Sequence, residues 1–286
     1  MWIIDSNQKT CSNSFFKDRK IEIINFDFKN PTKSNELIKK IRPDIVYHLA
    51  SNLTRTLDID NYKLLLEENY IPTLHLFTSL LKHSSVKQVI FMGTCEEYGQ
   101  KKKPFTENMC TDPTTPYSLY KTFCTSLSLM LYKYEHFPVV ILRPTITYGP
   151  YQNPNMFIPS LIINSLLKKP FPMTHGEQKR DFLYVDDLVD VLVLVGISNT
   201  MAGEIINIGS GHVAKIKDAA QTISELNNNE NYAQIGTLPY RDSEIMSYIT
   251  DTKKAKKLLN WEAKISLKDG LTKTFDWYKK NIRLYK

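Results

Sequence analysis

Residues 86–99 read Val-Lys-Gln-Val-Ile-Phe-Met-Gly-Thr-Cys-Glu-Glu-Tyr-Gly, and this segment indicates the fold class. A run of β-branched and aromatic residues stops at a glycine and is followed at once by polar side chains. This pattern is typical of a buried strand in a parallel sheet, and open α/β sheets hold their ligands at the carboxyl ends of such strands. Thr94 and Glu96 are therefore predicted to lie at a ligand-binding edge.

Similar short apolar runs recur on both sides of this strand. Strands are predicted at residues 2–4, 21–26, 44–49, 86–92 and 139–142. Helices are predicted between them at residues 33–41, 62–83 and 115–134, the second with an apolar face at Leu66, Tyr70, Leu74, Phe77 and Leu81. Alternating strands and helices predict an α/β fold with a Rossmann-like, doubly wound parallel sheet.

The pattern of predicted helices and strands changes after about residue 150. Helical segments there are interrupted by prolines and asparagines, with one further strand at residues 205–209 and a closing helix near 271–278. We expect a first domain at 1–150 that carries the sheet. Residues 151–286 are expected to form mainly a smaller C-terminal region, with some segments returning to the sheet.

The charge balance does not favour a nucleic-acid-binding protein. The 37 Lys and Arg residues exceed the 30 Asp and Glu residues by seven, but they are scattered in short runs such as 101–103 and 253–257. Such runs indicate a solvated surface, and the mild positive field would suit a diphosphate ligand. The four cysteines have no metal-ligand spacing, so no metal site and no disulfide framework are predicted.

The chain shows no sign of a membrane segment. No run of about 18 apolar residues occurs, and the longest apolar stretch, 188–197, contains Asp190. Residues 1–5 lack the features of a signal peptide. We therefore expect a soluble protein in the reducing cytoplasm.

Tyr117 and Lys121 are the first candidates for chemistry. They are four residues apart on a predicted helix and so share one face. An ammonium one helical turn from a phenol stabilises the phenolate, and such a tyrosine can exchange a proton with a sugar hydroxyl. Alone, this spacing also occurs in ordinary amphipathic helices.

Further segments downstream strengthen this interpretation. They are Leu-Arg-Pro at 142–144, Tyr-Gly-Pro at 148–150, Arg-Asp-Phe-Leu-Tyr-Val-Asp-Asp at 180–187 and Asn-Ile-Gly-Ser-Gly at 207–211. With the Tyr117/Lys121 pair and the strand end at Gly93, their order resembles the extended short-chain dehydrogenase/reductase family. That family contains nucleotide-sugar epimerases, dehydratases and 4-ketoreductases, and the likeness extends over nearly the whole chain.

The resemblance implies roles for individual residues. Tyr117 would be the acid/base, Lys121 its partner and a nicotinamide-ribose contact, and Thr94 would orient the reacting oxygen of the substrate. The loop beneath the cofactor diphosphate would be formed by His48, Leu49 and Ala50. Asp27 would lie near the adenine and Pro144 beside the nicotinamide, and Arg180 and Arg241 would bind the diphosphate of a nucleotide-diphosphate sugar.

The reaction itself is less sharply indicated. The segment from Pro239 to Met246 resembles the branch that reduces 4-keto-6-deoxysugars, so reduction at C4 of the hexose is the first prediction. Epimerisation at C4 is the second prediction. The Thr-x-Glu pattern at Glu96 resembles the 4,6-dehydratases, where the glutamate is a base, but Cys95 stands where many of those enzymes have Asp or Ser. Relatives commonly form homodimers through the helix that bears Tyr117 and Lys121.

One departure from the family concerns the cofactor site. The family opens with a strand, a glycine-rich turn and a helix that binds the pyrophosphate, yet none of the ten glycines precedes Gly93. Residues 8–19 show no helical period and are expected to form a loop between the second and third family strands. Asp5 would then end the second strand and bind the adenosine ribose, which favours NAD over NADP.

On this alignment roughly 25–30 residues of the family pattern are missing, because the ribose-binding acid usually follows the glycines by about 20 residues. We expect either an incomplete chain or a cofactor-less sugar-nucleotide-binding pseudoenzyme.

Overall fold

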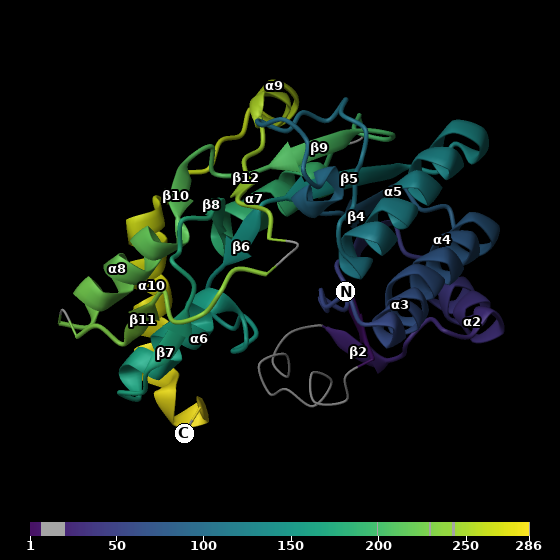
Figure 1. Ribbon diagram of the computed structural model, residues 1–286. Helices are drawn as coiled ribbons and strands as arrows, with labels where there is room; N and C mark the ends of the chain where they lie inside the picture. The colour runs from purple at the N-terminus through teal and green to yellow at the C-terminus, as the bar shows by residue number, and fades with distance from the viewer. Residues whose placement is uncertain (7–20, 199, 229, 242–243, 286) are drawn as a thin grey trace. The chain divides into compact units, whose positions relative to one another are not determined.

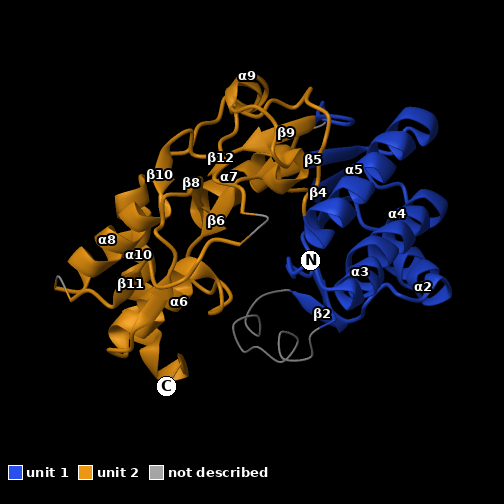
Figure 2. Cartoon of the chain, in the orientation of Figure 1, with its two compact units in different colours: residues 1–92, 115–141, 199–204 blue, residues 93–114, 142–198, 205–286 orange. Residues whose placement is uncertain are grey.

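The computed structural model describes residues 1–6, 21–198, 200–228, 230–241 and 244–285. The loop predicted at residues 8–19 lies outside these ranges. The described residues form two compact units, shown in Figure 2. The first comprises residues 1–92, 115–141 and 199–204, and the second comprises residues 93–114, 142–198 and 205–286. The predicted α/β Rossmann-like class is confirmed.

The first unit alternates strands and helices along the chain (Figure 1). Its elements are β1 (Trp2–Asp5), β2 (Glu22–Asn25), α2 (Pro31–Ile41), β3 (Ile45–His48), α3 (Ile59–Leu65), a π-helix η2 (Leu66–Tyr70), α4 (Ile71–His83), β4 (Gln88–Met92), α5 (Pro116–Glu135) and the start of β5 (Val139–Pro144). The predicted strands are all present, within two residues at each end.

Two sheets make up this unit. Strands β1 and β2 pair in parallel, from Trp2 opposite Glu22 to Asp5 opposite Asn25. Strand β3 belongs to a second sheet, where it pairs in parallel with β4, which neighbours β5. In the usual doubly wound order another strand lies between the positions of β1 and β3. Within the described residues no strand fills that position, and Trp2, Ile45 and Tyr47 are exposed.

The helix predicted at residues 62–83 differs from the prediction. It starts earlier and is interrupted by the π-turn of η2. The buried face follows Leu65, Asn69, Thr73, Leu76 and Leu80, one residue away from much of the predicted apolar stripe, although Phe77 is buried as expected. Two polar residues are on this face because Asn69 binds the loop after β3 and Thr73 binds His48.

The second unit contains most of the smaller elements. They are a 3-10 helix η3 (Cys95–Tyr98), the end of β5, β6 (Ile146–Tyr148), α6 (Phe157–Leu166), β7 (Phe171–Met173), β8 (Lys179–Tyr184), α7 (Val185–Gly196), β9 (Ile205–Ile208), β10 (Val213–Lys215), α8 (Ile216–Leu226), β11 (Ala233–Ile235), β12 (Ser247–Tyr248), α9 (Lys253–Leu259), α10 (Leu267–Asn281) and a 3-10 turn η4 (Ile282–Tyr285). Strand β9 neighbours β5, and β8 pairs with β6, β10 and β12.

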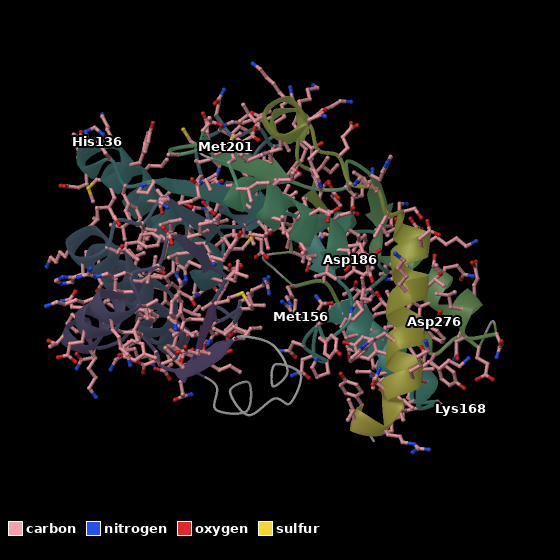
Figure 3. The ribbon with its side chains drawn as sticks, turned by 180° about the vertical axis from the view of Figure 1, so that it is seen from behind. His136, Met156, Lys168, Asp186, Met201 and Asp276 are labelled. Atoms are coloured by element: carbon pink, nitrogen blue, oxygen red, sulfur yellow. The ribbon has the colours of Figure 1, made fainter. Side chains whose placement is uncertain are left out.

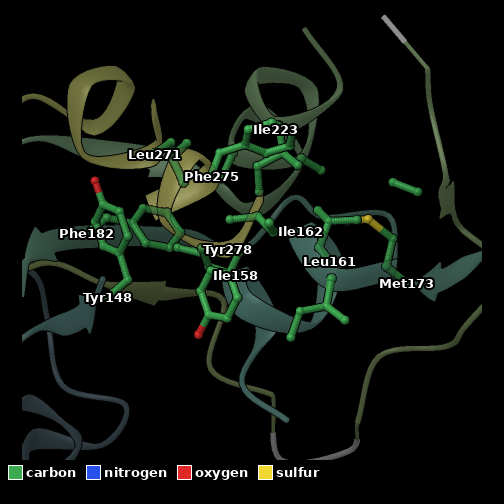
Figure 4. Packing of buried hydrophobic residues seen from close by; sticks show 14 of the residues in the cluster. Tyr148, Ile158, Leu161, Ile162, Met173, Phe182, Ile223, Leu271, Phe275 and Tyr278 are labelled. Carbon is green, nitrogen blue, oxygen red and sulfur yellow. The ribbon is translucent and has the colours of Figure 1, made fainter. Parts of the chain in front are cut away.

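The core of the second unit lies among α6, α8, α10 and β8. Figure 4 shows aromatic rings of Tyr148, Phe182, Phe275 and Tyr278 packed with aliphatic side chains of α6 and α8. Helix α10 is longer than the predicted 271–278 because Ser266 caps it, accepting a hydrogen bond from the Asp269 amide.

Candidate active site

Helix α5 begins where it does because of a cap. The Thr115 hydroxyl accepts a hydrogen bond from the Ser118 amide at 3.2 Å, and Pro116 occupies the first helical position. The helix ends at His136, labelled in Figure 3, whose left-handed backbone (φ 54°) stops it. Tyr117 therefore lies in the first turn of a helix of 20 residues, with Lys121 one turn further along.

The structure brings Tyr117 and Lys121 together at the carboxyl end of β4. Both side chains are buried, at 5% and 3% exposure. The Lys121 Nζ lies 5.9 Å from the centroid of the Tyr117 ring. It also donates a hydrogen bond to the Met92 carbonyl oxygen at 2.6 Å, which fixes the ammonium at the last residue of the strand. The two side chains lie close together, as their spacing on the helix predicts, and their role in proton exchange stays a prediction.

His48 ends β3 as a neutral side chain. Burial, and secondarily the Lys121 cation, lower the pKa of His48 to about 3. Its Nε2 is 2.8 Å from the Thr73 hydroxyl, and that hydroxyl donates its own proton to the Asn69 carbonyl. The His48 Nε2 must therefore carry the hydrogen in this pair. Leu49 and Ala50 follow as exposed residues, as suits a loop that faces a ligand.

The two candidate acids for the adenosine end follow β1 and β2. Asp5 is half-buried at the carboxyl end of β1. Asp27 is exposed, and its Oδ1 accepts a hydrogen bond from the Lys29 amide at 3.0 Å. The Asp27 carboxylate therefore stabilises a local turn, in addition to its predicted role near the adenine.

In the second unit, Thr94 caps the 3-10 helix η3. Its hydroxyl accepts from the Glu96 amide at 3.3 Å, and its own amide donates to the Glu97 Oε1 at 3.0 Å. Thr94 and Glu96 are each 6% exposed. Gly99 then turns the chain at φ 60°, where a Cβ would collide with the Asp112 carbonyl. Cys95 is buried in an apolar cluster with Tyr98, Phe105, Ile245 and Tyr248.

A buried ion pair supports this turn. Glu97 Oε2 accepts from Arg143 Nη2 at 2.6 Å, with both side chains at 2% exposure or less. Burial lowers the pKa of Arg143, but the adjacent Glu97 carboxylate raises it, and the net shift is upward. The Arg143 guanidinium also lies 4.5 Å from the Tyr98 ring centroid. Pro144, the next residue, ends β5 and is half-buried.

The two predicted diphosphate-binding arginines differ in their surroundings. Arg180, on β8, is buried, pairs with Glu244 at 2.7 Å and lies 4.9 Å from the Tyr248 ring centroid. Arg241 is exposed, and its carbonyl accepts a hydrogen bond from the Glu244 amide at 2.9 Å. Their common role towards a diphosphate stays a prediction.

Four residues near these groups escape the sequence reasoning: Arg55, Asn69, Glu97 and Arg143. Glu97 had a visible signal, because Thr94 and Glu97 form the Thr-x-x-Glu spacing of a capping box. Arg143 belongs to a quoted segment but carried no predicted role. Arg55 and Asn69 depend on a loop and a π-turn that no periodicity reveals.

Among the described residues, no group of three or more His, Cys, Asp or Glu side chains is arranged to hold a metal ion. In the same part of the chain, no helix has the length and apolar character needed to cross a membrane.

Residues 2–209 match the model of the "NAD dependent epimerase/dehydratase family". The chain belongs to this family. The predicted resemblance to nucleotide-sugar enzymes of the extended short-chain dehydrogenase/reductase type, and the prediction of an enzyme, are confirmed.

Individual members of the family are similar to this chain over most of its length. UDP-glucuronate 4-epimerase of Thermodesulfobacterium geofontis is 29% identical over 279 residues, covering 96% of this chain and 84% of the relative. The structure of Pal from Bacillus thuringiensis superposes with a TM-score of 0.87 at 32% identity, covering 98% and 91% of the two chains. UDP-glucuronic acid 4-epimerase from Bacillus cereus, solved with UDP-glucuronic acid and NAD, gives 0.88 at 28% identity and the same coverage.

The family implies NAD, and the residues of this epimerase/dehydratase chain fit it in part. The nicotinamide end fits, because Tyr117 and Lys121 are buried together at a strand end. At the adenosine end, half-buried Asp5 ends a parallel strand, which is the usual position of a ribose-binding acid. Residues 1–92 contain no glycine and so no counterpart of the glycine-rich turn that usually binds the pyrophosphate.

Proposed function

We propose that this chain is an NAD-dependent 4-epimerase of a nucleotide-diphosphate hexose. The observation that carries the proposal is the Tyr117/Lys121 pair fixed at the end of β4 by the bond from Lys121 to the Met92 carbonyl. An acid/base of this kind serves oxidation and reduction at one sugar carbon. Similarity to 4-epimerases and to 4,6-dehydratases favours these alternatives over the reduction of a 4-keto-6-deoxysugar, which is the first prediction from the sequence.

Cys95 favours epimerisation over 4,6-dehydration. Loss of water across C5 and C6 needs a base at C5 and an acid that protonates the leaving C6 oxygen. Glu96 could serve as the base, but the residue beside it is a cysteine packed in an apolar cluster. A thiol in such surroundings is a poor acid, and its burial makes it inert.

In the proposed reaction Tyr117 takes the proton of the C4 hydroxyl and later returns it to the C4 oxygen. Lys121 stabilises the phenolate during the interval. Thr94 would hold the C4 oxygen through its hydroxyl, and Arg180 and Arg241 would bind the diphosphate. His48, which is neutral, adds no charge at the end of β3. Bound NAD would supply reversible oxidation at C4, with NADP disfavoured by Asp5.

The test uses the purified chain with a large excess of NAD and, separately, UDP-glucuronate, UDP-glucose and dTDP-glucose. We expect at least one to be converted to its C4 epimer, seen by chromatography and NMR, without net NADH formation. A product that has lost water would show a 4,6-dehydratase acting through Glu96. Net NADH consumption in a single turnover with a 4-keto sugar would show a reductase.

A non-catalytic sugar-nucleotide binder is the second candidate, and the lack of any glycine before Gly93 favours it. Calorimetry distinguishes the two. Binding of a sugar nucleotide with no turnover at any NAD concentration would replace the epimerase proposal with this one. The predicted cytoplasmic location and homodimer stay predictions.

A further inference from the structure

The loop between β3 and α3 carries a cation that the proposed reaction does not use. Arg55 lies with its guanidinium carbon 4.8 Å from the centroid of the Tyr117 ring. The Lys121 ammonium is farther from the same centroid, at 5.9 Å. Both distances are within about 6 Å, where a cation is attracted to an aromatic ring. Tyr117 therefore has two cations beside its ring, from two different elements of the first unit.

The loop that bears Arg55 is anchored by the π-turn. Asn69 lies in η2 and is 4% exposed. Its Oδ1 accepts from the Asn52 amide at 2.7 Å, and its Nδ2 donates to the Asn52 carbonyl at 3.0 Å. This two-way pairing fixes the backbone of Asn52 to the helix. Single π-turns inside α-helices occur frequently at functional sites.

The chain from Asn52 to Arg55 is also held locally. Asn52 Oδ1 accepts from the Thr54 amide at 2.9 Å, and Asn52 Nδ2 donates to Glu68 at 2.6 Å. Arg55 Nη1 donates to the Leu53 carbonyl at 3.1 Å. These bonds hold the loop backbone and one guanidinium nitrogen, and in this arrangement the Arg55 guanidinium lies over the Tyr117 ring.

We propose that Arg55 is a positioning residue of the Tyr117 acid/base, stabilising its phenolate together with Lys121. The inference rests on the proposed function, in which Tyr117 exchanges the proton. When the phenol ionises, its ring carries negative charge, and a cation 4.8 Å away favours that form. An arginine suits this role because its charge does not titrate and its planar group stacks on rings.

Other titratable groups surround Tyr117 in the same unit. Tyr120 and Lys121 lie on its own helix, and Tyr70, from η2, packs against the same buried cluster. His48, near Lys121, is neutral and adds no charge.

The test measures the tyrosinate absorbance of Tyr117 directly. Each protein is titrated beside its Tyr117→Phe counterpart, and the difference isolates one phenol among the 16 tyrosines. Replacing Arg55 by Met should raise the apparent pKa of Tyr117 by about one unit, the lower end of the effect of an adjacent charge. Arg55→Lys should recover part of the shift. In kcat/KM, the acidic limb should move to higher pH by the same amount.

Lys133→Met is the matched control. Lys133 lies 5.2 Å from the ring centroid of Tyr134, near the far end of the same helix, so this variant removes an equivalent cation–ring contact elsewhere. It should leave the Tyr117 titration unchanged. An unchanged titration in Arg55→Met, or an effect confined to KM, would overturn the inference. Failure of the epimerase proposal shows separately, as full turnover in Tyr117→Phe or as absence of turnover in the parent.

Discussion

At the scale of single residues, the proposed chemistry depends on where the Tyr117 phenol and the Lys121 ammonium are held. Sequence reasoning found both because their spacing on a helix is a short-range property. It could not find Arg55, whose contact with Tyr117 joins residues 62 positions apart through a loop. It also predicted a role for Arg180 without its pairing to Glu244, 64 residues away. Short-range spacing predicts which side chains are candidates for the site, whereas tertiary contacts determine what surrounds them.

Tyr117→Phe tests the central residue. We expect turnover to fall by at least about 100-fold, because a positioned acid/base contributes about that much. Binding of the sugar nucleotide should change little, because the ring that packs with Leu65 and Tyr120 remains. Steady-state kinetics and calorimetry on the same preparation measure the two effects. Near-normal turnover would remove Tyr117 from the mechanism.

His48 predicts a pH dependence of stability. Its pKa is lowered from 6.5 to about 3 on folding, so the unfolded state binds a proton more readily. The contribution of neutral His48 to the free energy of unfolding is complete above the pKa that His48 has in the unfolded state. It is lost as the pH falls from there towards the pKa of the folded state. At about pH 5 the free energy of unfolding should be lower by about 2 kcal/mol. In urea denaturation, the free energy of unfolding of His48→Gln should change less with pH than that of the parent between neutral pH and about pH 5. Parallel pH profiles of the two proteins would contradict the lowered pKa of His48.

At the scale of elements, the strands were predictable and the π-turn was not. Each strand is a short apolar run ending in polar residues, and that local pattern locates it. In residues 59–83 the apolar residues continue at helical spacing, but η2 inserts an extra residue into the turn. This moves Asn69 and Thr73 onto the buried face. Hydrophobic spacing does not reveal such a shift, because the buried contacts there are polar.

The ion pair between Glu97 and Arg143 links η3 to β5. Glu97→Gln should leave a buried guanidinium without its counter-charge and lower the free energy of unfolding by about 3–5 kcal/mol. Replacing both residues by leucine and methionine should recover much of this loss. Lys256→Ala, which breaks an exposed pair with Glu262, should cost less than about 1 kcal/mol. Denaturant unfolding compares the three, and equal costs would show that burial is not decisive.

At the scale of the whole molecule, the chain passes repeatedly between two compact units. The sequence predicts a division of roles near residue 150, and that functional division stays a prediction. The arrangement of the strands bears on the binding of NAD. Within the described residues, β1 and β3 belong to different sheets, and no glycine precedes Gly93.

We therefore expect this chain to bind NAD weakly. Residues 1–92 contain no glycine, so they hold no counterpart of the glycine-rich turn whose amide groups bind a pyrophosphate at a helix N-terminus. Calorimetric titration of NAD and NADP should give no tight binding. UDP-glucuronic acid 4-epimerase from Bacillus cereus, which was solved with NAD, is the positive control. One-to-one binding at similar affinity would mean that residues 1–50 build the site in another way, and the role assigned to Asp5 would have to be abandoned.

The position of β3 has a consequence for amide hydrogen exchange. In the described part of the chain, β3 has a partner only on the side of β4. In a parallel ladder, successive backbone amides point alternately to the two sides of a strand. Exchange with deuterated water should therefore alternate along Ile45–His48, with every second amide exchanging quickly. Anything that pairs with the open side would abolish this alternation and make the four rates similar.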